Sequence, residues 1–188
     1  GAKNASYKQI IASMLTSEPV ELINVPQISD VKITKSIATH LGAKIEEFGE
    51  HSLSIQTKNI TDTVIPSGTG EKSRTSFIFS GPLLARYGQI TFPSPGGDQL
   101  GQRPLDRLFA CLKQMNVEII SNENSYTLKT SGLVGTDYTF PKPSHTSTEV
   151  ILMTAVTAKG DTIIRNAACE PEIDDLIELL NSMGGKIK

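Results

Sequence analysis

Three stretches of the 188-residue sequence resemble one another, and this repetition limits the possible folds more than any other feature. The stretches are LGAKIEEFGEHSLSIQT (41–57), MNVEIISNENSYTLKT (115–130) and MGGKIK (183–188). Corresponding positions 42, 116 and 184 are separated by 74 and 68 residues, a spacing that suits one supersecondary unit. We therefore expect a repeated architecture; the alternative is one irregular α/β domain in which the likeness is coincidental.

Each repeat contains an amphipathic helix pattern directly before the shared stretch. These patterns cover 28–40, 103–114 and 170–182, with apolar residues at helical spacing. Asp30, Pro104 and Pro171 suit helix starts, as N-cap or first-turn residues. Further upstream, short strands are expected at 18–26, 88–95 and 160–168. Before these strands lie helix candidates at 5–17, 74–88 and 148–160, which are apolar on more than one face and are expected to be buried.

The unit is therefore helix, strand, helix, strand, strand. Hairpins are expected over 44–57, with a turn near Gly49, and over 117–130, with a turn at 122–124. We expect one domain over 1–188, with repeats at about 1–60, 73–131 and 147–188 and the third repeat truncated. The apolar helices would pack in parallel at the centre, with the sheets outside, as an inside-out α/β barrel. All buried helices would then begin on one side of the domain.

Composition excludes several classes of protein. A net charge of −2 without a basic stripe argues against nucleic-acid binding, and no apolar run is long enough to span a membrane. Cys111 and Cys169 lack metal-ligand spacing, so we expect buried free thiols in a cytoplasmic protein. The three histidines are scattered, so neither a metal nor a cofactor is expected.

Cations gather at the expected starts of the three apolar helices. Lys3 and Asn4 precede the first, Arg74 the second, and Lys142 with Ser144 the third. A cation beside a helix N-terminus opposes the helix dipole, so the pattern favours an anionic ligand that offsets both. The alternative is that each is an ordinary solvated surface charge.

The sequence PGGDQLGQRP (95–104) joins an expected strand to an expected helix. Its glycines permit close approach to a ligand and suit a mobile lid, and Arg103 can hold a carboxylate or phosphate through two hydrogen bonds. The alternative is a surface turn built around Asp98. The spacing does not choose between the two.

Five segments carry a resemblance to a known family. They are GAKNA (1–5), SGPLLARYG (80–88), PGGDQLGQRP with LDR (95–107), TEVILM (148–153) and NAACEPEIDDLIELLNSMGGKI (166–187). Together they resemble the UDP-N-acetylglucosamine 1-carboxyvinyltransferases, the enolpyruvyl transferases of peptidoglycan synthesis. The sister family that makes enolpyruvyl-shikimate phosphate shares the fold but has a different lysine motif and lacks this loop pattern. The resemblance implies two similar domains of three units each, so that a second domain of the same enzyme would complete this one.

The resemblance also implies a reaction and its residues. The enolpyruvyl group of phosphoenolpyruvate would pass to the 3-hydroxyl of UDP-N-acetylglucosamine with release of phosphate, the first committed step of peptidoglycan precursor synthesis. Catalysis would fall to Asp98, Lys3 and Arg103, and phosphoenolpyruvate binding to Lys3, Asn4 and Arg103. The nucleotide sugar would be bound by Arg74, Arg103, Pro104, Leu105, Asp106, Arg107, Lys142, Ser144 and His145. The isolated chain would be inactive, because half of the cleft is missing.

Asp98 stands where most members of this family have a cysteine that acts as a proton donor and is alkylated by fosfomycin. A carboxylic acid can donate a proton if its pKa is raised towards neutrality. We therefore expect general acid catalysis by Asp98 and insensitivity to fosfomycin.

The segment KPSHTS (142–147) departs from the usual pattern, close to KVSVGA, at Pro143 and at residues 145–147. This segment normally lies along the nucleotide sugar. Two alternatives therefore stay open: a paralogous enolpyruvyl transferase with another acceptor, and a degenerate domain that only binds a nucleotide sugar. His145 is interpreted as a substrate contact or as a polar loop residue.

Overall fold

The computed structural model describes residues 3–70, 75–94 and 105–188. The helices are α1 (Lys3–Ala12), α2 (Ser29–His40), α3 (Ser67–Gly70), α4 (Ser80–Arg86), α5 (Leu105–Gln114), α6 (His145–Ala155) and α7 (Pro171–Ser182), with 3₁₀ turns η1 (Ser13–Leu15) and η2 (Ser76–Phe79). The strands are β1 (Val20–Leu22), β2 (Lys44–Glu47), β3 (Leu53–Gln56), β4 (Gln89–Pro93), β5 (Glu118–Ser121), β6 (Ser125–Lys129), β7 (Asp137–Thr139) and β8 (Ile163–Arg165).

Two three-stranded antiparallel sheets have the same construction. The strand orders are β1-β3-β2 and β4-β6-β5, so the last strand of each set lies in the middle. The central strands alternate as period-2 patterning requires: Leu53 and Ile55 are buried in β3, and Tyr126 and Leu128 in β6. The expected hairpins over 44–57 and 117–130 are thus present.

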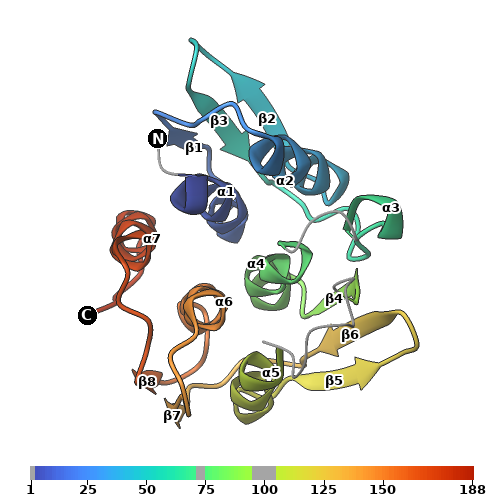
Figure 1. The fold of residues 1–188 in the computed structure, drawn as a ribbon, viewed down its shortest axis with the longest axis vertical. Helices are drawn as coiled ribbons and strands as arrows, with labels where there is room; N and C mark the ends of the chain where they lie inside the picture. Colours follow the sequence, from blue (N-terminus) through green and yellow to red (C-terminus); the bar gives the residue numbers. More distant parts are fainter. Residues whose placement is uncertain (1–2, 71–74, 95–104) are drawn as a thin grey trace.

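The centre of the molecule is helical. Figure 1 shows α1, α4 and α6 nearly end-on in the middle, with the two three-stranded sheets at the periphery. α6 is buried over most of its length, as is the segment formed by η2 and α4, whereas α2, α5 and α7 bury one face only. Gly81 allows α4 to approach α6 closely, because a Cβ at this position would lie 2.7 Å from the Cβ of Met153. The sequence patterns therefore distinguished the two kinds of helix correctly: those apolar on more than one face lie inside, and the amphipathic ones lie outside.

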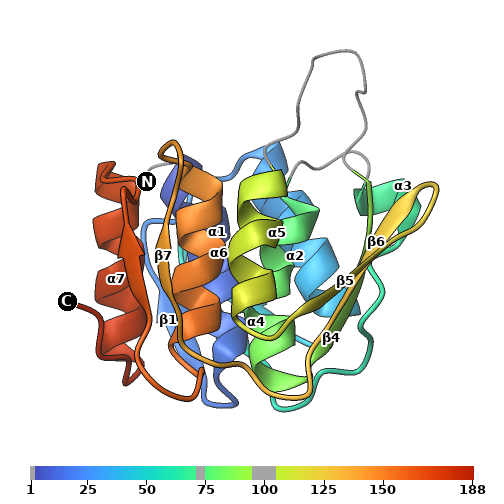
Figure 2. The ribbon, with the colours of Figure 1, turned by 90° about the horizontal axis from the view of Figure 1, so that it is seen from below.

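The inner helices run in the same direction. At one end, the Arg86 guanidinium at the end of α4 donates to the carbonyls of Met14 and Thr16, which follow α1. At the other end, the first turns of α1 and α6 both face Glu172 at the start of α7. Figure 2 shows α7, α6 and α5 side by side from a perpendicular direction. The three-repeat division and the barrel stay predictions.

The structure corrects several expected boundaries. α6 begins at His145, three residues before the expected helix at 148–160, and ends at Ala155. The short helix α3 and the strand β7, which pairs in parallel with β8, were not expected. Within the described residues, no helix is both long and apolar enough to cross a membrane.

The two cysteines differ in their surroundings. Cys111 is a buried free thiol in α5, as expected, and burial raises its pKa to about 12. Cys169 is exposed and precedes α7, so the expectation that it is buried in a regular segment was wrong. A strand was expected over residues 160–168, but β8 covers only Ile163–Arg165, because the residues after Arg165 turn towards α7.

Candidate active site

The first turns of α1, α5, α6 and α7 converge at one end of the molecule. Asn4 Nδ2 in α1 donates to Glu172 Oε1 in α7 at 3.4 Å. The Arg107 guanidinium in α5 donates to the Pro143 carbonyl, just before α6, at 3.5 Å. Helix starts carry free N–H groups and partial positive charge, which favour anions, although the first turns of α5 and α7 also carry Asp106, Glu172 and Asp174.

A buried ion pair joins two of these helices. Lys8 Nζ in α1 pairs with Glu149 Oε1 in α6, and the two side chains are 2% and 0% exposed. The second oxygen of Glu149, Oε2, accepts no hydrogen bond within the part of the chain that the structure describes. A charged pair withdrawn from water stabilises a fold little, because desolvation of both ions offsets their attraction. Stability alone therefore does not explain why Lys8 and Glu149 are buried as a pair.

His145 connects the buried pair to the surface. Its Nδ1 lies 3.1 Å from Lys8 Nζ and 3.3 Å from Glu149 Oε1, and its Nε2 lies 3.9 Å from Glu172 Oε2. The side chain is 24% exposed, so it is neither fully buried nor free in solvent. His145 is thus a helical residue packed among charges, and the interpretation as a polar loop residue was wrong.

Burial controls the protonation of this cluster. Desolvation raises the pKa of Glu149 to about 7, although the Lys8 ammonium acts in the opposite direction. Desolvation, and then the charge of Lys8, lowers the pKa of His145. The pKa of Tyr7, beside Lys8 on α1, is raised to about 12 by burial and by the nearby Glu149. The cluster thus holds a lysine, a neutral imidazole and a carboxyl that titrates near neutral pH.

Other expected site residues occupy the same end of the fold. Leu105 is buried at the start of α5, where it anchors the helix, and Asp106 is exposed in the first turn. Ser144 is the N-cap of α6, and its Oγ accepts from the Ser147 N–H at 3.4 Å. Lys142 is exposed just before this cap. The expected nucleotide-sugar residues of α5 and α6 therefore share one end of the fold with Asn4.

Several expected site residues lie outside the described residues: Arg74, Asp98, Arg103 and Pro104. Lys3 begins α1, but its side chain also lies outside the described part. The described segments that flank residues 95–104 are β4, which ends at Pro93, and α5, whose first turn belongs to the convergent end.

The sequence analysis did not assign Lys8, Glu149 or Glu172 to the site. A signal for the first two was present, because Lys8 is the single charge in the expected helix 5–17 and Glu149 directly precedes the apolar run VILM (150–153). Lysine and glutamate are almost never fully buried unless they are paired, so two such charges in helices expected to be neighbours predict an ion pair. No sequence pattern indicated that Glu172 would meet Asn4, since 168 residues separate them.

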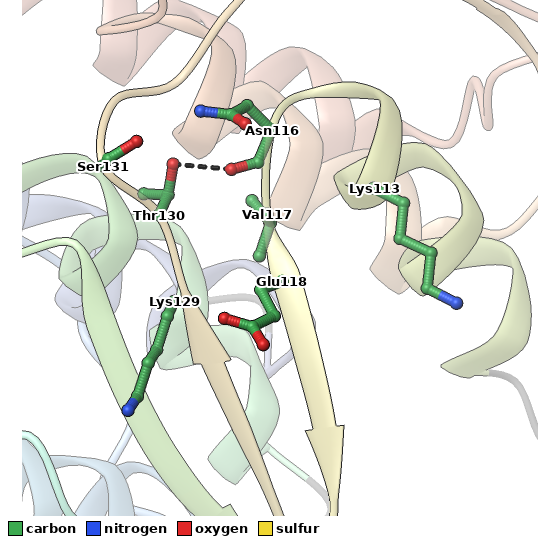
Figure 3. A pocket seen from close by; sticks show the side chains of 7 residues that line it. All are labelled: Lys113, Asn116, Val117, Glu118, Lys129, Thr130 and Ser131. Carbon is green, nitrogen blue, oxygen red and sulfur yellow. Dashed lines mark hydrogen bonds between the residues drawn. The ribbon is translucent and has the colours of Figure 1, made fainter.

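A surface hollow of the described residues lies elsewhere. It is lined by Lys113, Asn116, Val117, Glu118, Lys129, Thr130 and Ser131 (Figure 3). These residues lie in the last turn of α5 and beyond it, far from its first turn, and include no expected site residue. The Thr130 hydroxyl already donates to the Asn116 carbonyl at 2.7 Å, and the Asn116 amide donates to the Gly132 carbonyl at 2.9 Å. With these groups satisfied inside the protein, the hollow is a weaker candidate than the convergent helix starts.

Comparison with solved structures identifies the fold. The enolpyruvyl transferase NikO from Streptomyces tendae superposes with a TM-score of 0.86 at 16% sequence identity, covering 100% of this chain and 44% of that one. An EPSP synthase from Acinetobacter baumannii gives a TM-score of 0.77 at 19% identity, covering 100% and 43%. The fold is therefore that of the enolpyruvyl transferases.

Sequence comparison identifies the family. The family model described as EPSP synthase (3-phosphoshikimate 1-carboxyvinyltransferase) matches residues 1–188, and the chain belongs to this family. Proteins named UDP-N-acetylglucosamine 1-carboxyvinyltransferase are 41% identical in Borrelia garinii subsp. bavariensis and 42% identical in Carboxydothermus hydrogenoformans. The match covers 100% of this chain but only 44% of each relative, so the chain spans less than half of their length. The resemblance noted in the sequence is confirmed.

Proposed function

We propose that this chain is one domain of an enzyme that transfers the enolpyruvyl group of phosphoenolpyruvate to the 3-hydroxyl of UDP-N-acetylglucosamine. The observation that carries the proposal is the convergence of Asn4, Arg107 and Ser144 at the end of the fold where α1, α5, α6 and α7 begin. The names of relatives at 41% and 42% identity support the choice of substrates. The product would feed peptidoglycan precursor synthesis.

The reaction is an addition followed by an elimination. The acceptor hydroxyl adds to the enol carbon as a proton is delivered to the methylene carbon, and loss of phosphate with a proton then restores the double bond. Phosphoenolpyruvate brings a phosphate and a carboxylate, so most of the catalysis is electrostatic. Lys3, Asn4 and Arg103 are assigned to this ligand, and Asp98 is assigned as the proton donor.

The acceptor would lie along α5 and α6. Arg74, Arg103, Pro104 and the first turn of α5 (105–107) are assigned to the nucleotide, together with Lys142, Ser144 and His145 before and within α6. Helix starts that point at a diphosphate stabilise its charge without a metal ligand from the protein. The departure from the family pattern at Pro143 and residues 145–147 favours a second candidate, an enolpyruvyl transferase with a different acceptor.

A second domain would close the cleft. The relatives are more than twice as long as the matched region, since the match covers 44% of them, which supports a complementary domain of similar size. With only one wall of the site present, the 188-residue chain should bind ligands weakly and should not turn over.

Calorimetry and phosphate release together test this function. The chain joined to its complementary domain should release phosphate from phosphoenolpyruvate only when UDP-N-acetylglucosamine is present. Turnover with another nucleotide sugar in its place would favour the second candidate. Binding of the sugar without any phosphate release would instead indicate a degenerate binding domain, and turnover by the isolated chain would overturn the two-domain proposal.

A further inference from the structure

A continuous series of contacts links the buried ion pair to Asn4. Asn4 and Lys8 lie one helical turn apart on α1, and His145 and Glu149 lie one turn apart on α6, so each pair shares a helix face. The two faces meet at Lys8, and Glu172 at the start of α7 joins their outer members. The four links are Lys8 to Glu149, Lys8 to His145, His145 to Glu172, and Glu172 to Asn4.

The buried end of this series fixes the state of His145. The shorter contact of His145 Nδ1 is with Lys8 Nζ, at 3.1 Å, and the longer one is with Glu149 Oε1, at 3.3 Å. A lysine ammonium has donors and no acceptor, so in the shorter contact Nδ1 accepts. The single proton of a neutral imidazole then lies on Nε2, the nitrogen that faces Glu172 Oε2. Lys8 therefore determines which edge of the ring is presented as a donor at the surface.

The outer end fixes Asn4. One oxygen of Glu172 faces the imidazole, and the other accepts from Asn4 Nδ2 at 3.4 Å. Because the amide nitrogen of Asn4 is committed to Glu172, its oxygen is turned away from this partner. The rotamer of Asn4 therefore depends on where Glu172 is held, and Glu172 in turn faces His145.

We infer that Lys8, Glu149, His145 and Glu172 are positioning residues that hold Asn4 in the orientation that binds phosphoenolpyruvate. The inference rests on the proposed function, which assigns Asn4 to this ligand. Glu149 compensates the charge of Lys8 in the dry interior, Lys8 sets the tautomer of His145, and His145 with Glu172 orients the amide. Replacement of the buried pair by apolar residues of similar volume should cost little stability, so stability and positioning can be separated by experiment.

The decisive variant is the double substitution Lys8→Met/Glu149→Leu in the chain joined to its complementary domain. It leaves no unpaired buried charge, so the variant should fold, and its unfolding curve shows whether it does. The KM for phosphoenolpyruvate should rise about tenfold, as expected for a contact network of this kind. The KM for the acceptor should rise less, because His145, which is also assigned to the acceptor, stays in place. The matched control is Glu178→Gln, an exposed acid on α7 without a link to the series, which should change neither constant.

His145 provides a conservative rescue. Glutamine has both an acceptor and a donor at the end of its side chain, so His145→Gln can accept from Lys8 and donate towards Glu172. His145→Leu can do neither. We expect the glutamine variant to retain most of the phosphoenolpyruvate affinity and the leucine variant to match the double variant. Equal loss in both would overturn the positioning role of the ring.

Nitrogen NMR of His145 and of the Asn4 side-chain amide reads the network without turnover. The wild-type ring should be neutral with its proton on Nε2, and Lys8→Met/Glu149→Leu should shift the Asn4 amide resonances. A proton on Nδ1, unmoved Asn4 resonances, or an unchanged KM for phosphoenolpyruvate in the folded double variant would each overturn the inference. A wild-type enzyme that releases no phosphate with any acceptor would refute the proposed function instead, with the NMR result still deciding the network.

Discussion

Lys8 and Glu149, from helices that are 141 positions apart in the sequence, form an ion pair whose side chains are 2% and 0% exposed. Neither helix can bury its charge alone, because an isolated ion in the interior costs several kcal/mol. Each therefore requires the other, and the pair links α1 to α6. Since His145 contacts the same lysine at 3.1 Å, the protonation of this core is connected to the surface where Asn4 lies.

The first prediction concerns pH. The pKa of Glu149 is raised from 4.5 to about 7 by desolvation, so between these pH values the native state holds a proton that the unfolded state has released. Stability from this group is present below about pH 4.5 and is lost as the pH rises through about 7. The groups that face it are Lys8, Tyr7, His145, Glu170 and Glu172.

Urea unfolding of the wild type and of Glu149→Gln measures this effect. The difference in free energy of unfolding, wild type minus variant, should fall by about 3 kcal/mol from pH 4.5 to pH 7, since each unit of pKa shift corresponds to about 1.4 kcal/mol. The comparison cancels titratable groups that do not contact Glu149. A difference that stays level across this range would show that Glu149 is ionised in the native state throughout.

The second prediction concerns Arg86. Its Nη1 donates to the carbonyls of Met14, Thr16 and Thr57 at 2.9, 3.1 and 2.6 Å, and its Nη2 donates to the Lys58 carbonyl at 3.1 Å. Lysine cannot reproduce this fork, so Arg86→Lys should lower the free energy of unfolding by about 2 kcal/mol. Arg165→Lys is the control, because its ion pair with Asp137 is about half exposed, and it should change stability by less than about 0.5 kcal/mol. Equal effects in urea unfolding would refute the structural role of Arg86.

The third prediction tests the contact between α4 and α6. A Cβ at Gly81 would lie 2.7 Å from the Met153 Cβ, which is fixed close to the backbone and cannot swing aside. Gly81→Ala should therefore destabilise the chain by about 2 kcal/mol. Gly68→Ala is the matched control, since nothing lies within 4 Å of its added Cβ, and it should be neutral or stabilising by about 0.5 kcal/mol. Thermal unfolding measures both variants. A Gly81→Ala protein that is at least as stable as Gly68→Ala would contradict the close helix contact.

The fourth prediction addresses Asp98, which lies outside the described residues. If Asp98 is the proton donor, Asp98→Ala in the chain joined to its complementary domain should lose most turnover, whereas the wild type of this enzyme should resist fosfomycin. Asp98→Cys should become sensitive, because a thiolate opens the epoxide far more readily than a carboxylate does. Mass spectrometry of the adduct should be made with Cys169→Ser as background, since Cys169 is an exposed free thiol. Rapid inactivation of the wild type would refute the assignment.

The sequence by itself determined most secondary structure and the separation of inner from outer helices. Apolar residues at helical spacing placed α2, α5 and α7 with one buried face, and Pro171 correctly marked the first turn of α7. The hairpins were visible because their alternating residues lie beside turn residues such as Gly49, whose φ of 67° suits glycine. These features are local, so the residues that define them are neighbours in the chain.

Tertiary structure alone decided the contacts among charges. Glu172 meets Asn4 across 168 residues, and Lys8 meets His145 across 137, so no local pattern encodes either contact. β7 was missed for the same reason, because a three-residue strand exists only through its parallel partner β8. His145 was interpreted as a substrate contact or as a polar loop residue. The loop interpretation was wrong because the helix start depends on the Ser144 cap, and the surroundings of His145 depend on α1 and α7. The packing of distant helices creates the low-dielectric interior that pairs Lys8 with Glu149, and only the folded chain has that interior.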